Sequence, residues 1–279
     1  MTEPMDGLHR ELPLAHAPRS LPPNDLATLT AAVRDLQASR GVVIRAADLL
    51  AGMFGSAAAM SVRGLKLSPA LTKKMQGLAE VALRRAFDLS ILGSTRRSRL
   101  ATPRRMRVLV AASGAVGGFA GLSGFLPDAC LTTLLMMRSI AEIAREEGEE
   151  LDAEDARRAC LEVFAFGSPL LGEESDQPDF SYWSTRLLIH GRPMMLLISE
   201  TAARYGLRIS EKFALQAVPL VGAAGGALIN SVFLDHYRKL ARVHFAIRRL
   251  ERRYGGLEIR EEAQRIAAEL RLARRSAAA

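Results

Sequence analysis

Cysteine and aromatic residues are scarce in this chain. The first scarcity argues against redox and zinc motifs, and the second argues against a fold rich in β-sheet. Only two cysteines occur among the 279 residues, Cys130 and Cys160, and they lack the CxxC spacing of redox and zinc motifs. We expect both to be free thiols packed in a reduced interior, which favours a cytoplasmic location. Aromatic residues make up 5% of the chain. Because strands recruit aromatic and β-branched side chains, this composition favours helices over sheets.

Familiar catalytic and cofactor motifs are also lacking. The chain contains no GxxxxGK[ST] phosphate loop, no HExxH metal motif and no Cys/His cluster. We therefore expect no cofactor and no metal ion, and a non-enzymatic protein is favoured over an enzyme. Glu3 and Asp6 come early, and no apolar run of signal length follows them, which disfavours a secretory signal.

The chain does contain enough apolar residues for a large core, together with an excess of basic charge. Hydrophobic residues make up 49% of it, and the formal net charge is +8 at pH 7. Such a surplus indicates an anionic partner, which could be a membrane surface, a nucleic acid or an acidic protein. Nucleic acid is disfavoured because the basic stretches lack interleaved aromatic residues and any known reader motif.

Proline content and hydrophobic periodicity divide the chain. Five prolines fall within residues 1–24, which predicts a disordered arm. From 25 to 275 apolar residues recur at helical spacing, and no stretch alternates apolar and polar residues as a strand would. We therefore predict a single helical domain over 25–275 and a short tail at 276–279. Its fold class is all-α, a multi-helix bundle built around two glycine-striped apolar helices, with little or no sheet.

The two glycine stripes are the most distinctive feature of the sequence. The first comprises Gly114, Gly117, Gly118, Gly121 and Gly124, and the second comprises Gly222, Gly225 and Gly226. A glycine inside a helix costs about 1 kcal/mol relative to alanine, so a compensating gain is required. Close approach of another backbone supplies one. We predict that each stripe lies on one helix and that the two pack face to face; irregular glycine loops are the alternative.

Both glycine-rich segments also have the length of a membrane span. Residues 108–127 and 213–234 carry no charge. Their glycines, together with Gln216, Pro219 and Asn230 in the second segment, make insertion marginal. A buried core is the preferred interpretation, and an integral membrane protein remains an alternative.

Two basic clusters flank these segments. Along 238–254, an apolar stripe at alternating spacings of three and four faces a core, while arginines occupy the opposite face with Phe245 among them. The clusters comprise Arg104, Arg105 and Arg107, and then Arg238, Arg242, Arg249, Arg252 and Arg253. A cationic face bearing an aromatic side chain suits an anionic bilayer, to which each basic residue contributes about 1 kcal/mol. We predict peripheral binding to an anionic membrane surface or lipid, with an ordinary solvated face as the alternative.

One polar site is a candidate for ligand binding. Asp128 and Asp235 each follow a glycine-rich segment, where an unpaired charge is expensive. With Arg138 and His236 they could gather at the end of the striped pair and bind a polar headgroup or a metal, and a hydrolase-like enzyme using Asp128, Asp235 and His236 is an alternative function. Asp128 could instead be a helix cap, and Arg138 could form a local ion pair with Glu142.

Three stretches together resemble a known family. They are Gly117–Leu134 with Arg138–Ala144, Ala159–Gly167, and Val218–Ala227 with Asp235-His236-Tyr237. Over roughly residues 40–255 the chain resembles the EcsC protein family. The resemblance implies a bacterial protein linked to an ABC-transporter operon that affects secretion, and hence an ABC-transporter protein as a possible partner at the inner membrane. It implies no reaction and no catalytic residue.

Overall fold

A computed structural model describes residues 21–38, 103–119, 122–166 and 219–278, with scattered positions between 73 and 88 and between 182 and 199. The described part of the chain is helical and contains no strand, so the predicted all-α class is confirmed. Most of the predicted arm, residues 1–20, lies outside the described residues, as do Gly121 and residue 279 of the tail.

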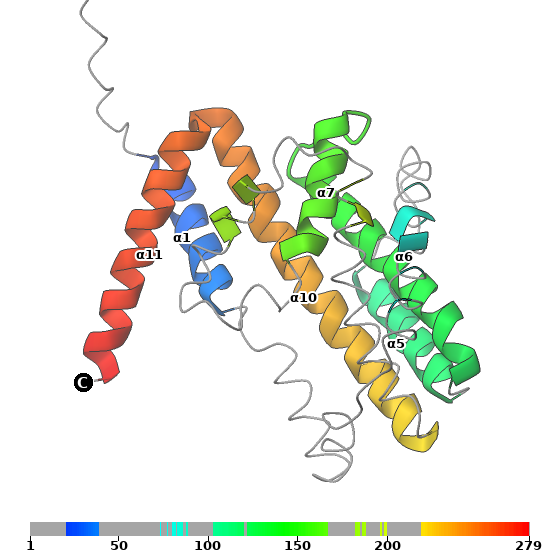
Figure 1. Cartoon of the computed structure of the whole chain (residues 1–279). Coiled ribbons are helices and arrows are strands. Elements are labelled where there is room, and N and C mark those ends of the chain that lie inside the picture. Colours follow the sequence, from blue (N-terminus) through cyan, green and yellow to red (C-terminus); the bar gives the residue numbers. More distant parts are fainter. Residues whose placement is uncertain are drawn as a thin grey trace, which may run out of the picture.

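Six helices are described over their full length. They are α1 (Pro23–Ala38), α5 (Pro103–Phe119), α6 (Leu122–Glu146), α7 (Glu154–Phe166), α10 (Pro219–Tyr254) and α11 (Gly256–Ala278). The longest, α10, runs through the centre of the described structure and packs against each of the others (Figure 1). The α5–α6 hairpin lies along its first half, whereas α1 and α11 pack around its C-terminal half.

The core follows the apolar stripe predicted on α10. Leu240, Val243, Ile247 and Leu250 are all buried, as the spacing of three and four residues requires. They belong to one hydrophobic cluster with residues of α1, α5, α6, α7 and α11. The helix α10 thus contacts the apolar residues of all the other helices in this core.

Glycines with positive φ end two of the helices. Gly148 (φ 81°) follows α6, where the N–H groups of Gly148 and Glu149 donate to the carbonyls of Arg145 and Ala144. This pattern closes a helix C-terminus and needs a left-handed residue. Gly255 (φ 105°) separates α10 from α11 and lets the chain reverse direction there (Figure 1).

The structure corrects four expectations from the sequence. The first glycine stripe does not lie on one helix, because α5 ends at Phe119 and α6 begins at Leu122. Asp128 is not a helix cap but lies within α6. Cys130 is exposed, whereas Cys160 is buried as expected. Phe245 does not project among arginines, because it is fully buried in the core.

Within the described residues, no helix is both long enough and apolar enough to cross a membrane.

Candidate functional site

Glycines bring three helices into close contact at one crossing. A Cβ atom at Gly114 of α5 would collide with the carbonyl oxygen of Gly226 in α10 and lie 2.7 Å from Nδ2 of Asn230. A Cβ at Gly117 would collide with Asp128 of α6. The two stripes therefore meet through Gly114 and Gly226, while Gly117 faces the other arm of the α5–α6 hairpin. The loss of helix propensity is offset by this close approach of backbones.

A buried carboxylate occupies the crossing. Asp128 is only 3% exposed. Its Oδ1 accepts hydrogen bonds from Ser113 Oγ of α5 (2.5 Å), Asn230 Nδ2 of α10 (2.9 Å) and Thr132 Oγ1 (3.2 Å). Asn230 Nδ2 also lies 3.2 Å from the carbonyl of Val110. Donors from three helices thus satisfy this buried carboxyl group, as the burial of a polar group requires.

The other residues of the predicted polar site lie among different partners. Arg138 and Glu142 form the local ion pair at 3.6 Å. Asp235 pairs with Arg107 at 2.8 Å on the surface. His236 is half-buried, with its ring 5.6 Å from that of Tyr237. Asp128 therefore belongs to the helix crossing, whereas Asp235 belongs to a surface pair between α5 and α10.

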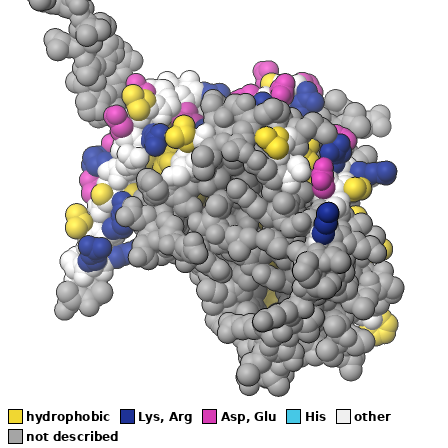
Figure 2. All heavy atoms as spheres, viewed as in Figure 1, with side chains coloured by type: hydrophobic (Ala, Val, Ile, Leu, Met, Phe, Trp, Pro, Cys, Tyr) yellow, Lys and Arg dark blue, Asp and Glu magenta, His cyan; other side chains and the backbone are white. Residues whose placement is uncertain are grey.

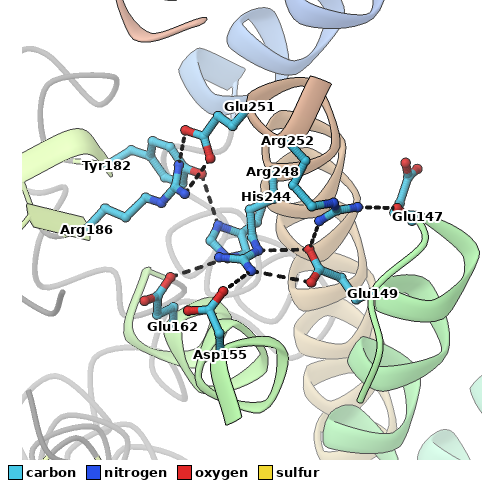
Figure 3. Close-up of polar contacts among 10 residues, drawn as sticks. All are labelled: Glu147, Glu149, Asp155, Glu162, Tyr182, Arg186, His244, Arg248, Glu251 and Arg252. Atoms are coloured by element: carbon cyan, nitrogen blue, oxygen red, sulfur yellow. Dashed lines mark hydrogen bonds and ion pairs between the residues drawn. The ribbon is translucent and has the colours of Figure 1, made fainter. Parts of the chain in front are cut away.

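A second buried polar network, which the sequence analysis missed, surrounds His244 (Figure 3). Nδ1 of His244 lies 3.0 Å from the Tyr182 hydroxyl, and Nε2 lies 3.4 Å from Oε2 of Glu162 in α7. Next to them, Arg186 makes two 2.6 Å hydrogen bonds to Glu251 of α10. Tyr182 and Arg186 come from one short segment, so these contacts fasten that segment to α10.

Glu149 holds the other half of this network together. This carboxylate, whose side chain is 5% exposed, accepts from Arg248 Nε (2.9 Å) and also binds Arg252. Arg248 extends to Asp155 of α7 at 2.7 Å, and Arg252 donates to the carbonyl of Glu147 (2.8 Å). The turn after α6, the start of α7 and the last turns of α10 are thereby joined (Figure 3).

Burial determines the protonation states in this network. Desolvation, and then the charges of Arg186 and Arg248, lower the pKa of His244 well below its ordinary value. A neutral imidazole can accept from the Tyr182 hydroxyl at Nδ1 and direct an Nε2–H toward Glu162. Desolvation also raises the pKa of the Tyr182 hydroxyl, so it stays protonated. It raises the pKa of the Cys160 thiol to about 12, which leaves that cysteine unreactive.

Because folding keeps His244 neutral, stability should depend on pH. The unfolded chain protonates this histidine near pH 6.5, whereas the folded chain resists protonation until well below that value. Below pH 6.5 the unfolded state therefore binds more protons, and the free energy of unfolding should fall by up to about 1.4 kcal/mol per pH unit. Urea denaturation between pH 7.5 and 5 should show a shallower slope for His244→Gln. Equal slopes in variant and wild type would contradict a depressed pKa.

The predicted basic face on α10 is largely paired with acidic groups. Arg238 is buried against Ser139. Further along the helix, the arginines pair with carboxylates of α1 and of the turn after α6: Arg249 with Glu147, Arg252 with Glu149 and Arg253 with Asp25. Figure 2 shows basic and acidic side chains of the described residues interspersed along the upper part of the view. Arg104, Arg105 and Arg242 are exposed.

The outer face of α5 combines exposed basic and apolar side chains. Val108, Val116 and Phe119 are 66%, 71% and 69% exposed, and Ala112 between them is exposed as well. Their spacing of four, four and three residues places them on one line along the helix. Arg104 begins the same line one turn earlier. We call Arg104, Val108, Ala112, Val116 and Phe119 the α5 ridge.

The sequence predicted some features of these sites and missed others. Glycine spacing pointed to the crossing of α5 and α10, and the arginine run pointed to the basic end of the α5 ridge. No local signal connected His244 with Glu162 and Tyr182, because each of these residues comes from a different part of the chain and the contacts form only in the folded core.

Comparison with known proteins places these features in a family. Residues 70–250 match the model of the EcsC protein family. Searches of curated proteins and of solved structures gave no match. The matched residues include the helix crossing, the α5 ridge and nearly all of the network around His244. Since the match spans well over half of the 279 residues, the chain belongs to the EcsC protein family.

Proposed function

We propose that this protein is a non-enzymatic, peripheral membrane protein that binds the anionic cytoplasmic surface of the inner membrane through the α5 ridge. The observation that carries the proposal is the exposure of Val108, Val116 and Phe119 in line with Arg104. Large apolar side chains in a contiguous exposed line are typical of interaction surfaces. The ridge spans 16 residues, with about 23 Å of helix between its two ends, which is long enough to lie flat in a bilayer interface.

Charge favours a lipid surface as the occupant. Arg104 and Arg105 lie at the start of α5, where they can reach headgroup phosphates while the apolar part of the ridge enters the acyl boundary. Each basic side chain near an anionic leaflet contributes about 1 kcal/mol, and the net charge of +8 adds long-range attraction. An exposed line of apolar side chains beside arginine suits a fluid lipid surface, which adapts to its shape.

Vesicle co-sedimentation tests the proposal. Replacing Val116 and Phe119 together by serine should weaken binding to phosphatidylglycerol vesicles at least ~10-fold, because most of the apolar contact is lost. The matched control replaces Leu257 and Leu272 of α11 by serine, since both are 66% exposed and lie outside the ridge. That variant should bind as the wild type does. Equal binding by the two double variants would overturn the assignment to the α5 ridge.

A protein partner is the competing occupant, since the family resemblance also suggests an ABC transporter. The same variants distinguish the two cases. If the wild type ignores pure lipid vesicles but sediments with native membranes until these are treated with protease, the ridge binds a membrane protein and the lipid proposal fails. Retained binding to protease-treated membranes and to vesicles supports lipid.

A further inference from the structure

The fold brings together two basic clusters that are about 130 residues apart in the sequence. Helices α5 and α10 run antiparallel, with Gly114 against Gly226. Two turns nearer the start of α5, Arg107 pairs with Asp235, which lies further along α10. In the same antiparallel register, Arg238 lies opposite the first turn of α5. The first turns of α5 thus lie beside residues 235–239 of α10, and Arg242 lies one helical turn beyond Arg238 at the same end of the crossing.

Arg238 is the buried member of this group. It is 7% exposed, and its Nη1 donates to Ser139 Oγ of α6 at 2.5 Å. Among the described residues, no carboxylate lies within ion-pair distance of it. Glu142 and Glu146 act on it from further away, while Arg107 and Arg242 repel it. Burial and these two arginines lower the pKa of Arg238, which means that its surroundings leave the cation incompletely balanced.

The start of α5 adds to this positive charge. A helix N-terminus carries a partial positive charge and ordinarily attracts acidic residues. The first turn of α5, like those of α6 and α10, contains no acidic residue. It is occupied instead by arginines. The helix therefore presents its positive end together with the basic cluster, an arrangement that an anion would stabilise.

We propose that Arg107, Arg238 and Arg242 form a binding site for a phosphate group between the first turns of α5 and residues 238–242 of α10. Arg238 is the fixed donor, since Ser139 holds its side chain. Arg242 is exposed and has no ion-pair partner among the residues that the structure describes. Arg107 exchanges its surface pair with Asp235 for the phosphate, a change that costs little because both side chains are about half exposed.

The position of the site links it to the α5 ridge. Arg104, the first residue of the ridge, lies one turn before Arg107 on the same helix. The phosphate could be a free anion or the headgroup of a lipid, and only the lipid form rests on the proposed membrane function. Guanidinium groups favour phosphate because their planar N–H pairs match two of its oxygens.

Thermal unfolding with inorganic phosphate tests the site independently of membranes. At saturating phosphate and matched ionic strength, we expect the midpoint of the wild type to rise by about 2–4 °C relative to chloride. Arg242→Gln should lose at least half of this rise without unfolding the protein, because its side chain is exposed. The matched control is Arg274→Gln on α11, which is also exposed and should respond as the wild type does.

Competition then identifies the source of the phosphate. If the site takes a lipid headgroup, free phosphate should displace the protein from phosphatidic acid vesicles, and Arg242→Gln should bind those vesicles several-fold more weakly. If the site takes only a free anion, neither added phosphate nor the Arg242→Gln substitution will affect vesicle binding. The variant with serine at both Val116 and Phe119 should keep its thermal response to phosphate even if it no longer binds vesicles. The phosphate site and the membrane-binding α5 ridge are therefore tested separately. No thermal response in the wild type, or equal responses of Arg242→Gln and Arg274→Gln, would overturn the phosphate site.

Discussion

Replacing Gly114 by alanine should destabilise the protein by about 2 kcal/mol or more, although alanine is the better helix former. The added Cβ would collide with the carbonyl oxygen of Gly226 and crowd Asn230. Backbone cannot yield as a flexible side chain can, so α5 must move away from α10, and overpacking of this kind costs about 1–3 kcal/mol or more. Such a shift would also stretch the hydrogen bonds that donors of α5 and α10 make to Asp128. Urea denaturation monitored by circular dichroism measures the loss.

Gly77→Ala is the matched control for this result. Gly77 is also helical, but nothing lies within 4 Å of the position that its Cβ would take. Only the difference in helix propensity between glycine and alanine then acts, and we expect the free energy of unfolding to rise by up to about 1 kcal/mol. The two substitutions are chemically identical and should have opposite signs. If Gly114→Ala is neutral or stabilising, the close approach of α5 to α10 is not a property of the folded protein.

The second large effect should come from Glu149→Gln, which we expect to cost about 3–5 kcal/mol. Glutamine preserves the size of the side chain but removes the charge that holds Arg248 and Arg252. The loss is severe because Arg248, whose side chain is only 13% exposed, keeps its charge in a poorly solvated place, whereas Arg252 is 42% exposed and adds less. Arg248 keeps Asp155, but that carboxylate is largely exposed and compensates only in part. The expected outcome is a much lower midpoint in urea.

Glu262→Gln provides the comparison on the surface. Glu262 pairs with Arg265 on the same turn of α11, and more than half of the arginine side chain is exposed. Ion pairs in such positions contribute little because water competes for both charges. We expect the urea midpoint to stay close to that of the wild type. Similar losses from Glu149→Gln and Glu262→Gln would mean that the network around Arg248 does not hold α6, α7 and α10 together.

Periodicity and glycine spacing predicted the elements that pack through regular contacts. The apolar stripe from Leu240 to Leu250 faces the core because helical geometry alone places it there. Phe245 shows the limit of that argument. It lies outside the stripe, and it is buried because α10 is surrounded by other helices rather than covered on one face. A helix wheel assigns a single buried side, and a central helix has several.

Polar contacts between distant segments were beyond prediction for a different reason. Asp128 looks like a helix cap because it follows a proline and precedes an apolar run. Its role is set by Ser113 and Asn230, which approach only after α5 folds back on α6 and α10 packs across both. The glycine spacing could not predict that α5 ends and α6 begins within this run, because glycines are compatible both with a turn and with a continuous, closely packed helix.

The place of α10 late in the chain has a consequence for biosynthesis. Helices α1, α5, α6 and α7 are all translated before it, yet each of them packs against it. Until about residue 254 has left the ribosome, their apolar faces lack the partner that they share. The nascent chain must therefore carry exposed hydrophobic surface through most of its synthesis, which makes folding depend on contacts of large sequence separation. Chaperones that shield such surfaces should be needed during translation more than after it.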